Sequence, residues 1–574
     1  MKKLALPVLF FFMISSLWAM PPMPGSGHTH DGSVFYDDEE PAALYAPALS
    51  SDNSSESSSA KYPITVSTTG NKTILVILAA FSDLAFNSGS ATIPGTQTHD
   101  ASYYSNLLQG ASGLTMKQYY LQQSRDKLNL SFKVVGPYIA DFGYSYYGAN
   151  YAGIRSEDIR PGHLIYEMLN KAKPDVESSG VSLDNCSVIV IHAGPGEEES
   201  AASADCIWSH RSSLTKRNKS EGGGIPPVTI GGKAFDDYLV VPEYNVWRNT
   251  AAAKYEYEAT IGVFCHEFGH VLGLQDAYDT SYATNGVGAW SLMGAGSWGT
   301  VGKAGKPSGS DPAPLMAWER LALGWIDEEI IDLDYSDSST CSFKEMNSEE
   351  KVYTVKLTDN QFLLFEGKAQ NMSGTGMCVP ESGLLITQMH KGILSTYWGK
   401  NTINNGSSRP HGVMVMEAVA ENYKENGLGN LWRAESTSNR FTTTALFRSG
   451  TLTSVGPSTK TESASIPFMP IFIDTIIASG VVIGMLAAWY AGRRKLCAVI
   501  AVAVTAVCIS MGCTVYVDSG GGTKDAGPNT NYYTTTYNVH SKTGISGITI
   551  SNIKCKSDGS GSFVIKKANY SSAE

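Results

Sequence analysis

The sequence predicts an α+β protein of several domains, and three features of its 574 residues indicate this. A chain of this length is too long for one hydrophobic core. Residues 62–326 mix apolar runs typical of strands with segments of helical periodicity. Residues 327–455 lose that periodicity and consist of short apolar runs between turn residues, which predicts a β-rich domain. Apolar stretches over residues 467–512 predict a C-terminal transmembrane segment or hairpin.

The first 61 residues show no sign of a packed core. Residues 1–19 contain two lysines, then an apolar run, then a small residue, which is the pattern of a secretory signal peptide. Residues 20–61 hold an acidic cluster and a serine-rich run, so we expect a disordered segment or a pro-segment. The net charge is -11 and the basic run Arg493-Arg494-Lys495 is short, so we expect no nucleic-acid partner.

Strands and helices alternate in the first domain. The continuous apolar run Ile74–Phe81 predicts a buried strand, and Val188–Ile191 predicts another. Apolar and polar residues alternate from Leu128 to Val134, which predicts a half-buried strand. Helices are expected over Thr115–Ser124 and His163–Lys173.

The run His266-Glu267-Phe268-Gly269-His270 bears directly on chemistry. Residues four apart lie on one face of a helix, so His266 and His270 can direct both imidazoles at one metal ion. Glu267 points beside that face, where its carboxylate can take a proton from an attacking water without being a ligand. Gly273 can end the helix in a left-handed turn, which brings Asp276 within reach as a third ligand.

A histidine pair at this spacing also arises by chance on structural helices, but the residues that follow favour a metal site. Gly273 and Asp276 have the metzincin spacing. Met293, within Trp290-Ser291-Leu292-Met293-Gly294, falls where such folds place a methionine turn beneath the metal. We therefore predict a metzincin-like zinc peptidase domain with one catalytic Zn²⁺.

Two further helices are expected around this motif. The helix that carries it should begin near Tyr255, and a helix over Leu315–Leu323 should close the domain near Trp325. Cys265 precedes His266, but successive helix residues point about 100° apart, so we interpret it as core packing. His192 and His210 are interpreted as structural or substrate-cleft residues.

The chain resembles the immune inhibitor A-like metallopeptidases, which are secreted bacterial zinc endopeptidases. The most specific matching segments are HEFGHVLGLQDAYDT and WSLM, and strand-like segments such as ILVILAAFSD and VIVIHAGPGEEES match in order over about residues 70 to 420. The resemblance implies His266, His270 and Asp276 as zinc ligands, Glu267 as general base and Met293 in the supporting turn. Gln275 departs from the family, which commonly has proline there.

Calcium is a second candidate cofactor. The loop after the strand Val188–Ile191 carries Glu197 and Glu198, and hard carboxylate oxygens after a strand can bind Ca²⁺. Asp279, near the zinc motif, can do likewise. The alternative is a solvated acidic loop, and the resemblance favours calcium slightly.

The β-rich domain over residues 327–455 shows no chemistry of its own. In an exported protein its Cys341 and Cys378 can form a disulfide, as can Cys186 and Cys206, although sequence does not settle the pairing. A polar linker over 456–466 follows, and the Ser/Gly/Thr-rich tail over 513–574 contains two short strand-like runs that identify no function.

The region 467–512 contains apolar stretches at Pro467–Tyr490 and Leu496–Gly512, joined by five residues of which three are basic. A span needs about 20 apolar residues, within a range of roughly 17 to 25, so two spans fit. The basic connection favours a hairpin with its turn in the cytoplasm. The alternative is a single span that ends at the arginines.

Together these features predict an exported, membrane-anchored zinc endopeptidase that cleaves protein or peptide substrates on the extracytoplasmic face, from which proteolysis can release it. An intramembrane protease is excluded, because the polar run KYEYEAT precedes the motif and the apolar stretches lie far downstream. The remaining alternative is a non-catalytic surface-binding module that retains a relic zinc site.

Overall fold

A computed structural model describes residues 18–19, 62, 64–86, 98–150, 158–198, 205–216, 224–250, 253–281, 286–299, 308–331, 339–343, 351–356, 361–368, 383–405, 411–415, 446–447, 453–455, 548–555 and 560–567. The predicted disordered or pro-segment, the linker and the transmembrane region 467–512 lie outside these ranges. Among the described residues, no helix is both long enough and apolar enough to cross a bilayer.

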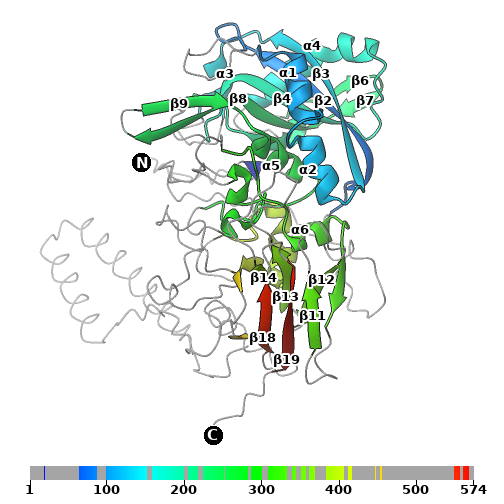
Figure 1. Ribbon diagram of the computed structural model, residues 1–574. Helices are drawn as coiled ribbons and strands as arrows, with labels where there is room; N and C mark the ends of the chain where they lie inside the picture. Colours follow the sequence, from blue (N-terminus) through cyan, green and yellow to red (C-terminus); the bar gives the residue numbers. More distant parts are fainter. Residues whose placement is uncertain are drawn as a thin grey trace, which may run out of the picture.

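A mixed sheet forms the centre of the first domain (Figure 1). Its strands lie in the order β1 (Trp18–Ala19), β5 (His210–Ser213), β8 (Asp237–Thr250), β4 (Ser187–Pro195), β2 (Gly70–Ala80) and β3 (Leu128–Ile139), and β9 (Ala253–Glu258) pairs with β8. The neighbours β3, β2, β4 and β8 run parallel, whereas β1, β5 and β9 are antiparallel to their partners. All three predicted strands of this domain are therefore confirmed.

Helices cover both faces of this sheet. On one face lies α4 (Pro161–Ser178), which packs against Leu75, Ile77 and Val190. The opposite face, with Ile74, Val76 and Ile189, contacts α1 (Ala101–Gln109), α2 (Met116–Gln123) and α5 (Ile261–Val271). Successive strand side chains point to opposite faces, so a continuous apolar strand such as β2 must be covered on both. The predicted mixture of helix and strand is confirmed, and it is arranged as a layered α/β unit.

The helices begin where a capping residue or the pairing of a neighbouring strand requires it. Thr115 caps α2, because its Oγ1 accepts from Gln118 N at 3.2 Å while the Gln118 side chain accepts from Thr115 N at 3.1 Å. The prediction that the motif helix begins near Tyr255 is wrong, since residues 253–258 form β9 and α5 begins only at Ile261. Tyrosine and glutamate alternate in KYEYE with the period of a strand, and antiparallel pairing to β8 selects that conformation.

Several short elements complete the first domain. They are α3 (Tyr144–Gly148), the ribbon of β6 (Val228–Ile230) and β7 (Lys233–Phe235), the 3₁₀ turns η4 (Leu214–Lys216), η5 (Gly288–Trp290) and η6 (Ala295–Trp298), and α6 (Ala317–Ala322). The predicted helices over 163–173 and 315–323 correspond to α4 and α6.

The second domain is built on a second sheet, as its short apolar runs predict. Its strands lie in the order β10 (Asp327–Ile330), β12 (Lys351–Lys356), β13 (Gln361–Lys368), β14 (Gly383–His390) and β15 (Val413–Val415), and β16 (Leu446–Phe447) pairs with β14. After β14 the chain forms α7 (Lys391–Tyr397) and the turn η8 (Trp398–Lys400).

A third sheet joins strands of the tail to strands of the second domain. Its order is β11 (Ser339–Phe343), β19 (Gly561–Lys567), β18 (Ile548–Cys555) and β17 (Thr453–Val455), and all pairs are antiparallel (Figure 1). Phe563, from the tail, is fully buried and stacks on Phe365 with ring centroids 5.1 Å apart. The tail strands are therefore part of the β-rich domain, a pairing that sequence separation of about 200 residues concealed.

One apolar cluster runs through both domains. It extends from Phe268 on α5 through Trp318 on α6 to Leu363 on β13 and Phe563 on β19. Trp318 also meets Trp398 edge to face, with ring centroids 6.2 Å apart. The predicted boundary at residue 326 is therefore a change in secondary structure, and packing continues across it.

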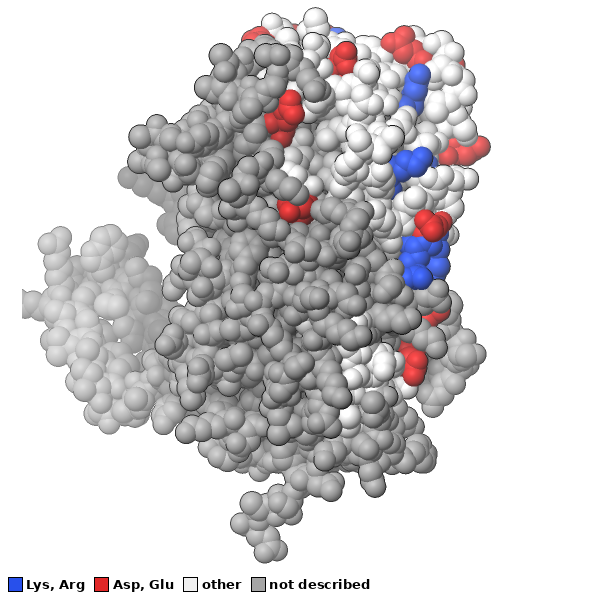
Figure 2. Space-filling view, viewed as in Figure 1, with Lys and Arg blue, Asp and Glu red and all other residues white. Residues whose placement is uncertain are grey.

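The charged side chains visible on the described surface are of both signs. Figure 2 shows acidic and basic residues interspersed along one edge of the first domain. Such mixed charge differs from the single-sign face that typifies binding to a polyanion.

Candidate metal centre

The helix α5 ends in a turn that redirects the chain toward its own histidines. Leu274 N donates to Gly269 O at 3.0 Å, and Gly273 N donates to His270 O at 2.9 Å. These two bonds are the Schellman pattern, in which the residue after the C-cap is left-handed. Gly273 has φ of 95°, as the expected glycine turn requires. The chain then returns along the helix end and places Asp276 opposite the two imidazoles.

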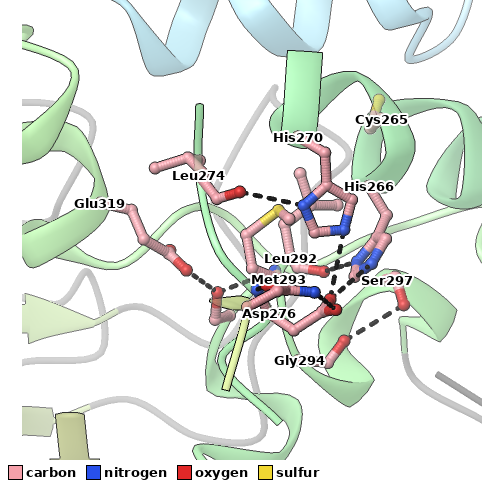
Figure 3. Close-up of polar contacts among 12 residues, drawn as sticks. Cys265, His266, His270, Leu274, Asp276, Leu292, Met293, Gly294, Ser297 and Glu319 are labelled. Carbon is pink, nitrogen blue, oxygen red and sulfur yellow. Dashed lines mark hydrogen bonds and ion pairs between the residues drawn. The ribbon is translucent and has the colours of Figure 1, made fainter. Parts of the chain in front are cut away.

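Both histidine rings are buried and oriented by backbone carbonyls (Figure 3). The Nδ1 atom of His266 lies 2.9 Å from Leu292 O, and Nδ1 of His270 lies 2.9 Å from Leu274 O. A carbonyl only accepts, so each Nδ1 carries a proton and each Nε2 is the ring nitrogen that faces Asp276. This is the arrangement that orients a metal-binding imidazole.

The Oδ1 atom of Asp276 meets these two nitrogens. It lies 3.2 Å from His266 Nε2 and 3.3 Å from His270 Nε2. Two ligand atoms about 2.0–2.1 Å from a tetrahedral zinc ion lie roughly 3.3 Å apart, so the spacing fits that ion. Three converging acceptors would repel one another without a cation. Among the described residues, these three are the only group of three or more His, Cys, Asp or Glu side chains whose ligand atoms all lie within 4.8 Å of one another, and the two-nitrogen, one-oxygen set suits zinc.

The protonation states favoured by the surroundings are those a metal ligand needs. Burial lowers the pKa of His270, and the nearby carboxylate of Asp276 offsets this only in part. Burial acts to raise the pKa of Asp276, but the adjacent histidines hold it below its usual range. A neutral imidazole and an ionised carboxylate can bind a cation without first losing a proton.

The turn around Met293 supports the centre from below. Met293 is fully buried, its backbone N donates to Ser291 Oγ at 2.9 Å, and its carbonyl accepts from Ala277 N at 2.7 Å. A Cβ added to Gly269 would lie 2.5 Å from Met293 Sδ. The methionine turn thus packs directly against the glycine between the two histidines, and its neighbour Leu292 supplies the carbonyl that orients His266.

The residues on either side of His266 differ in role. Cys265 is fully buried in the core, burial raises its thiol pKa, and its carbonyl accepts from Tyr120 Oη at 2.5 Å. Its predicted packing role is confirmed. Glu267 is also fully buried on α5, next to the converging ligands. Its role as general base stays a prediction.

The residues predicted for calcium are buried and hydrogen-bonded. Glu197 Oε1 accepts from Asn150 Nδ2 at 2.7 Å, and Glu198 accepts from Ser209 Oγ at 2.6 Å and from Ser209 N at 3.1 Å. Asp279 Oδ1 accepts from the backbone and hydroxyl of Ser281. The alternative of a solvated acidic loop is wrong for Glu197 and Glu198, which are fully buried.

Two other histidines are buried among protein groups. His192 is fully buried, and burial lowers its pKa to about 4; its ring stacks on Tyr144 with centroids 5.5 Å apart. His210 places Nδ1 2.7 Å from Trp208 O and Nε2 3.3 Å from Tyr238 Oη.

The suggested disulfide between Cys186 and Cys206 is wrong, because both are free thiols. Cys186 directly precedes the nine-residue strand β4, whereas Cys206 lies beyond the other end of that strand. A strand of nine residues spans roughly 30 Å, and a disulfide needs Cα atoms within about 7 Å. Cys341 is also a free thiol, and Cys378 lies outside the described residues.

Sequence reasoning missed contacts around the centre that come from α6 and from the second domain. Asn401, after η8, hydrogen-bonds Asp276, and Glu319 on α6 accepts from Ser291 Oγ at 2.5 Å. Glu366 on β13 in turn accepts from Ala317 N at 3.2 Å. A single polar residue so far along the chain belongs to no recognisable sequence motif. The only feature of the sequence that could have indicated these contacts is the asparagine-rich segment 401–405.

Comparison with known proteins agrees with this geometry. Residues 180–326 match the family model described as immune inhibitor A peptidase M6, catalytic domain. The pre-pro-metalloprotease PrtV of Vibrio cholerae is 29% identical over 326 residues, which cover 50% of this chain and 33% of that protein. Immune inhibitor A of Bacillus thuringiensis is 34% identical over 158 residues, covering 26% of this chain and 20% of that protein. The chain thus spans about a third or less of the length of these relatives. Residues 180–326, which contain the metal centre, are thus similar to the catalytic domain of the immune inhibitor A peptidase M6 family.

Proposed function

We propose that the chain is an exported, membrane-anchored zinc-dependent endopeptidase. The observation that carries the proposal is the convergence of His266 Nε2 and His270 Nε2 on Asp276 Oδ1, at 3.2 and 3.3 Å. The curated relatives are named as a metalloprotease and an immune inhibitor, which supports a peptidase.

The residues of α5 suit peptide-bond hydrolysis. A bound zinc ion supplies a Lewis acid that polarises a carbonyl and lowers the pKa of water to about 7. Glu267, one residue from His266 and outside the ligand set, accepts the proton of the attacking water and delivers it to the leaving amine. The ligands are held rigidly, because the Nδ1 atom of each imidazole is hydrogen-bonded to a backbone carbonyl.

The test separates chemistry from metal binding. Purified full-length chain is assayed for zinc content and for casein hydrolysis. Glu267→Gln should lose proteolysis by a factor of at least about 100 while zinc stays near one ion per chain. His270→Ala should lose both. Casein hydrolysis by Glu267→Gln at the wild-type rate would show that the proposed base is wrong.

A non-catalytic module with a relic zinc site is the competing function. It predicts bound zinc without hydrolysis in the wild-type chain. Retention of a buried glutamate next to the ligands favours the enzyme, because a carboxylate in that place costs desolvation free energy that a purely structural site does not need.

Strand pairing supports a membrane hairpin over a single span. The strand β17 precedes the apolar region and pairs with β18, which follows it, and β19 pairs with β11. Both sides of the region therefore belong to one sheet and lie on the same side of any membrane. A chain that leaves and returns to the same side crosses an even number of times, so Pro467–Tyr490 and Leu496–Gly512 serve as paired spans.

A tag placed after Glu574 tests this topology in intact cells. Protease added outside should remove the tag and also cleave the catalytic domain. Protection of the tag, with the catalytic domain accessible, would rule out the hairpin.

Calcium is retained as a proposal for the buried carboxylates after β4. Addition of excess Ca²⁺ should raise the melting temperature of the wild-type chain, because a ligand that binds only the folded state stabilises it. Glu198→Gln should abolish the increase. An equal increase in both chains would assign the calcium elsewhere.

A further inference from the structure

The second domain reaches the metal centre through an asparagine-rich segment. Residues 401–405, which follow η8, lie along the loop that contains Asp276. Asn404 Nδ2 donates to Ala277 O at 2.8 Å. Asn405 accepts from Thr280 N at 3.0 Å and donates to Thr280 Oγ1 at 2.7 Å. Side-chain amides therefore hold this loop at several successive points.

Asn401 makes the contact closest to the chemistry. Its Oδ1 accepts from Asp276 N at 2.7 Å, and its Nδ2 donates to Asp276 Oδ2 at 2.5 Å. The residue is almost fully buried and has φ of 52°, in the left-handed region. Asparagine tolerates that conformation better than most residues, and its amide offers a donor and an acceptor on one short, planar group.

These two bonds determine how Asp276 faces the metal. Oδ2 is directed at Asn401, so Oδ1 is the oxygen that points to the Nε2 atoms of His266 and His270. The bond to the backbone of Asp276 fixes the position of the residue as well as the rotation of its carboxylate. Without Asn401 the carboxylate could turn and expose either oxygen.

We propose that Asn401 is a positioning residue for the zinc centre, so that the second domain completes the metal site of the first. The inference rests on the proposed zinc function. Groups that orient metal ligands typically contribute a factor of about 10 to 100 in metal affinity. It also explains why one apolar core joins the two domains, since a hinged second domain would not hold Asn401 against Asp276.

The test compares variants of the full-length chain by their zinc affinity, measured by competition with a chelator after metal removal. Asn401→Gly removes the amide and leaves the left-handed backbone without strain. We expect its zinc affinity to fall about 10- to 100-fold. Asn401→Ser, whose hydroxyl is too short to bond both atoms of Asp276, should fall in the same direction and decides the question if the glycine variant does not fold.

The matched control is Asn405→Ala. It removes an equally buried amide with two hydrogen bonds from the same segment, but those bonds go to Thr280 and not to a ligand. Its zinc affinity should stay within about threefold of wild type. Wild-type affinity in the folded Asn401 variants, or an equal loss in Asn405→Ala, would overturn the inference.

The outcomes also separate this inference from the proposed function. If the wild-type chain binds no zinc, the proposed function fails. If the wild-type chain binds zinc and cleaves casein while Asn401→Gly keeps full affinity, only the positioning role fails.

Discussion

Replacing Gly269 by alanine tests how closely the methionine turn packs under the metal centre. The added Cβ would lie 2.5 Å from Met293 Sδ and 3.2 Å from Met293 Cε. Non-bonded heavy atoms are in favourable contact at about 3.5–4.0 Å, so Met293 would have to move by about 1 Å. Met293 is fully buried, which leaves little room for that movement.

Two opposing effects determine the magnitude. Overpacking a core usually costs about 1–3 kcal/mol, whereas glycine to alanine within a helix stabilises by about 0.8–1.0 kcal/mol. Gly269→Ala should therefore change the free energy of unfolding by about 0 to 2 kcal/mol in the destabilising direction. In a Met293→Ala background the clash is absent, and the same substitution should stabilise by up to about 1 kcal/mol.

The assay is thermal unfolding of the purified full-length chain, followed by tryptophan fluorescence, for the four members of this double-mutant cycle. Zinc content is measured alongside, because movement of the turn displaces the Leu292 carbonyl that orients His266. A change of the same sign and size in both backgrounds would refute the packing argument.

Three further predictions concern buried residues in the two domains. Burial raises the pKa of Glu319 from 4.5 to about 8, so the folded chain keeps a proton that the unfolded chain releases above pH 4.5. The protonated Glu319 therefore stabilises the folded chain below pH 4.5. As the pH rises from there to about 8, the free energy of unfolding falls by up to about 1.4 kcal/mol per pH unit. Glu319→Gln should remove this pH dependence from the free energy of unfolding measured between about pH 5 and 8. Phe563→Ala should cost about 3–5 kcal/mol, because the ring is fully buried against Phe365, and limited proteolysis should then cleave the second domain faster than in wild type. Asp276→Ala should lose zinc while Asp279→Ala retains it, and the reverse result on metal analysis would show that the wrong carboxylate was chosen.

The candidate metal residues could be predicted from sequence because their geometry is local. A spacing of four residues on a helix sets the relation of His266 and His270, and a glycine after the helix sets the return of the chain to Asp276. The strands β2 and β4 were predictable for a similar reason, since a continuous apolar run has to be covered on both faces. Each of these features depends on residues within a few positions of one another.

Tertiary structure decided what depends on contacts between distant segments. KYEYE became the strand β9 because β8 offers it a partner, and the tail strands joined the second domain because β18 pairs with β17 and β19 with β11. Asn401 reaches Asp276 across 125 positions of sequence. Pairing and hydrogen bonding of this kind leave no periodic pattern along the chain, because the partner of each group is chosen by the packing of the whole molecule.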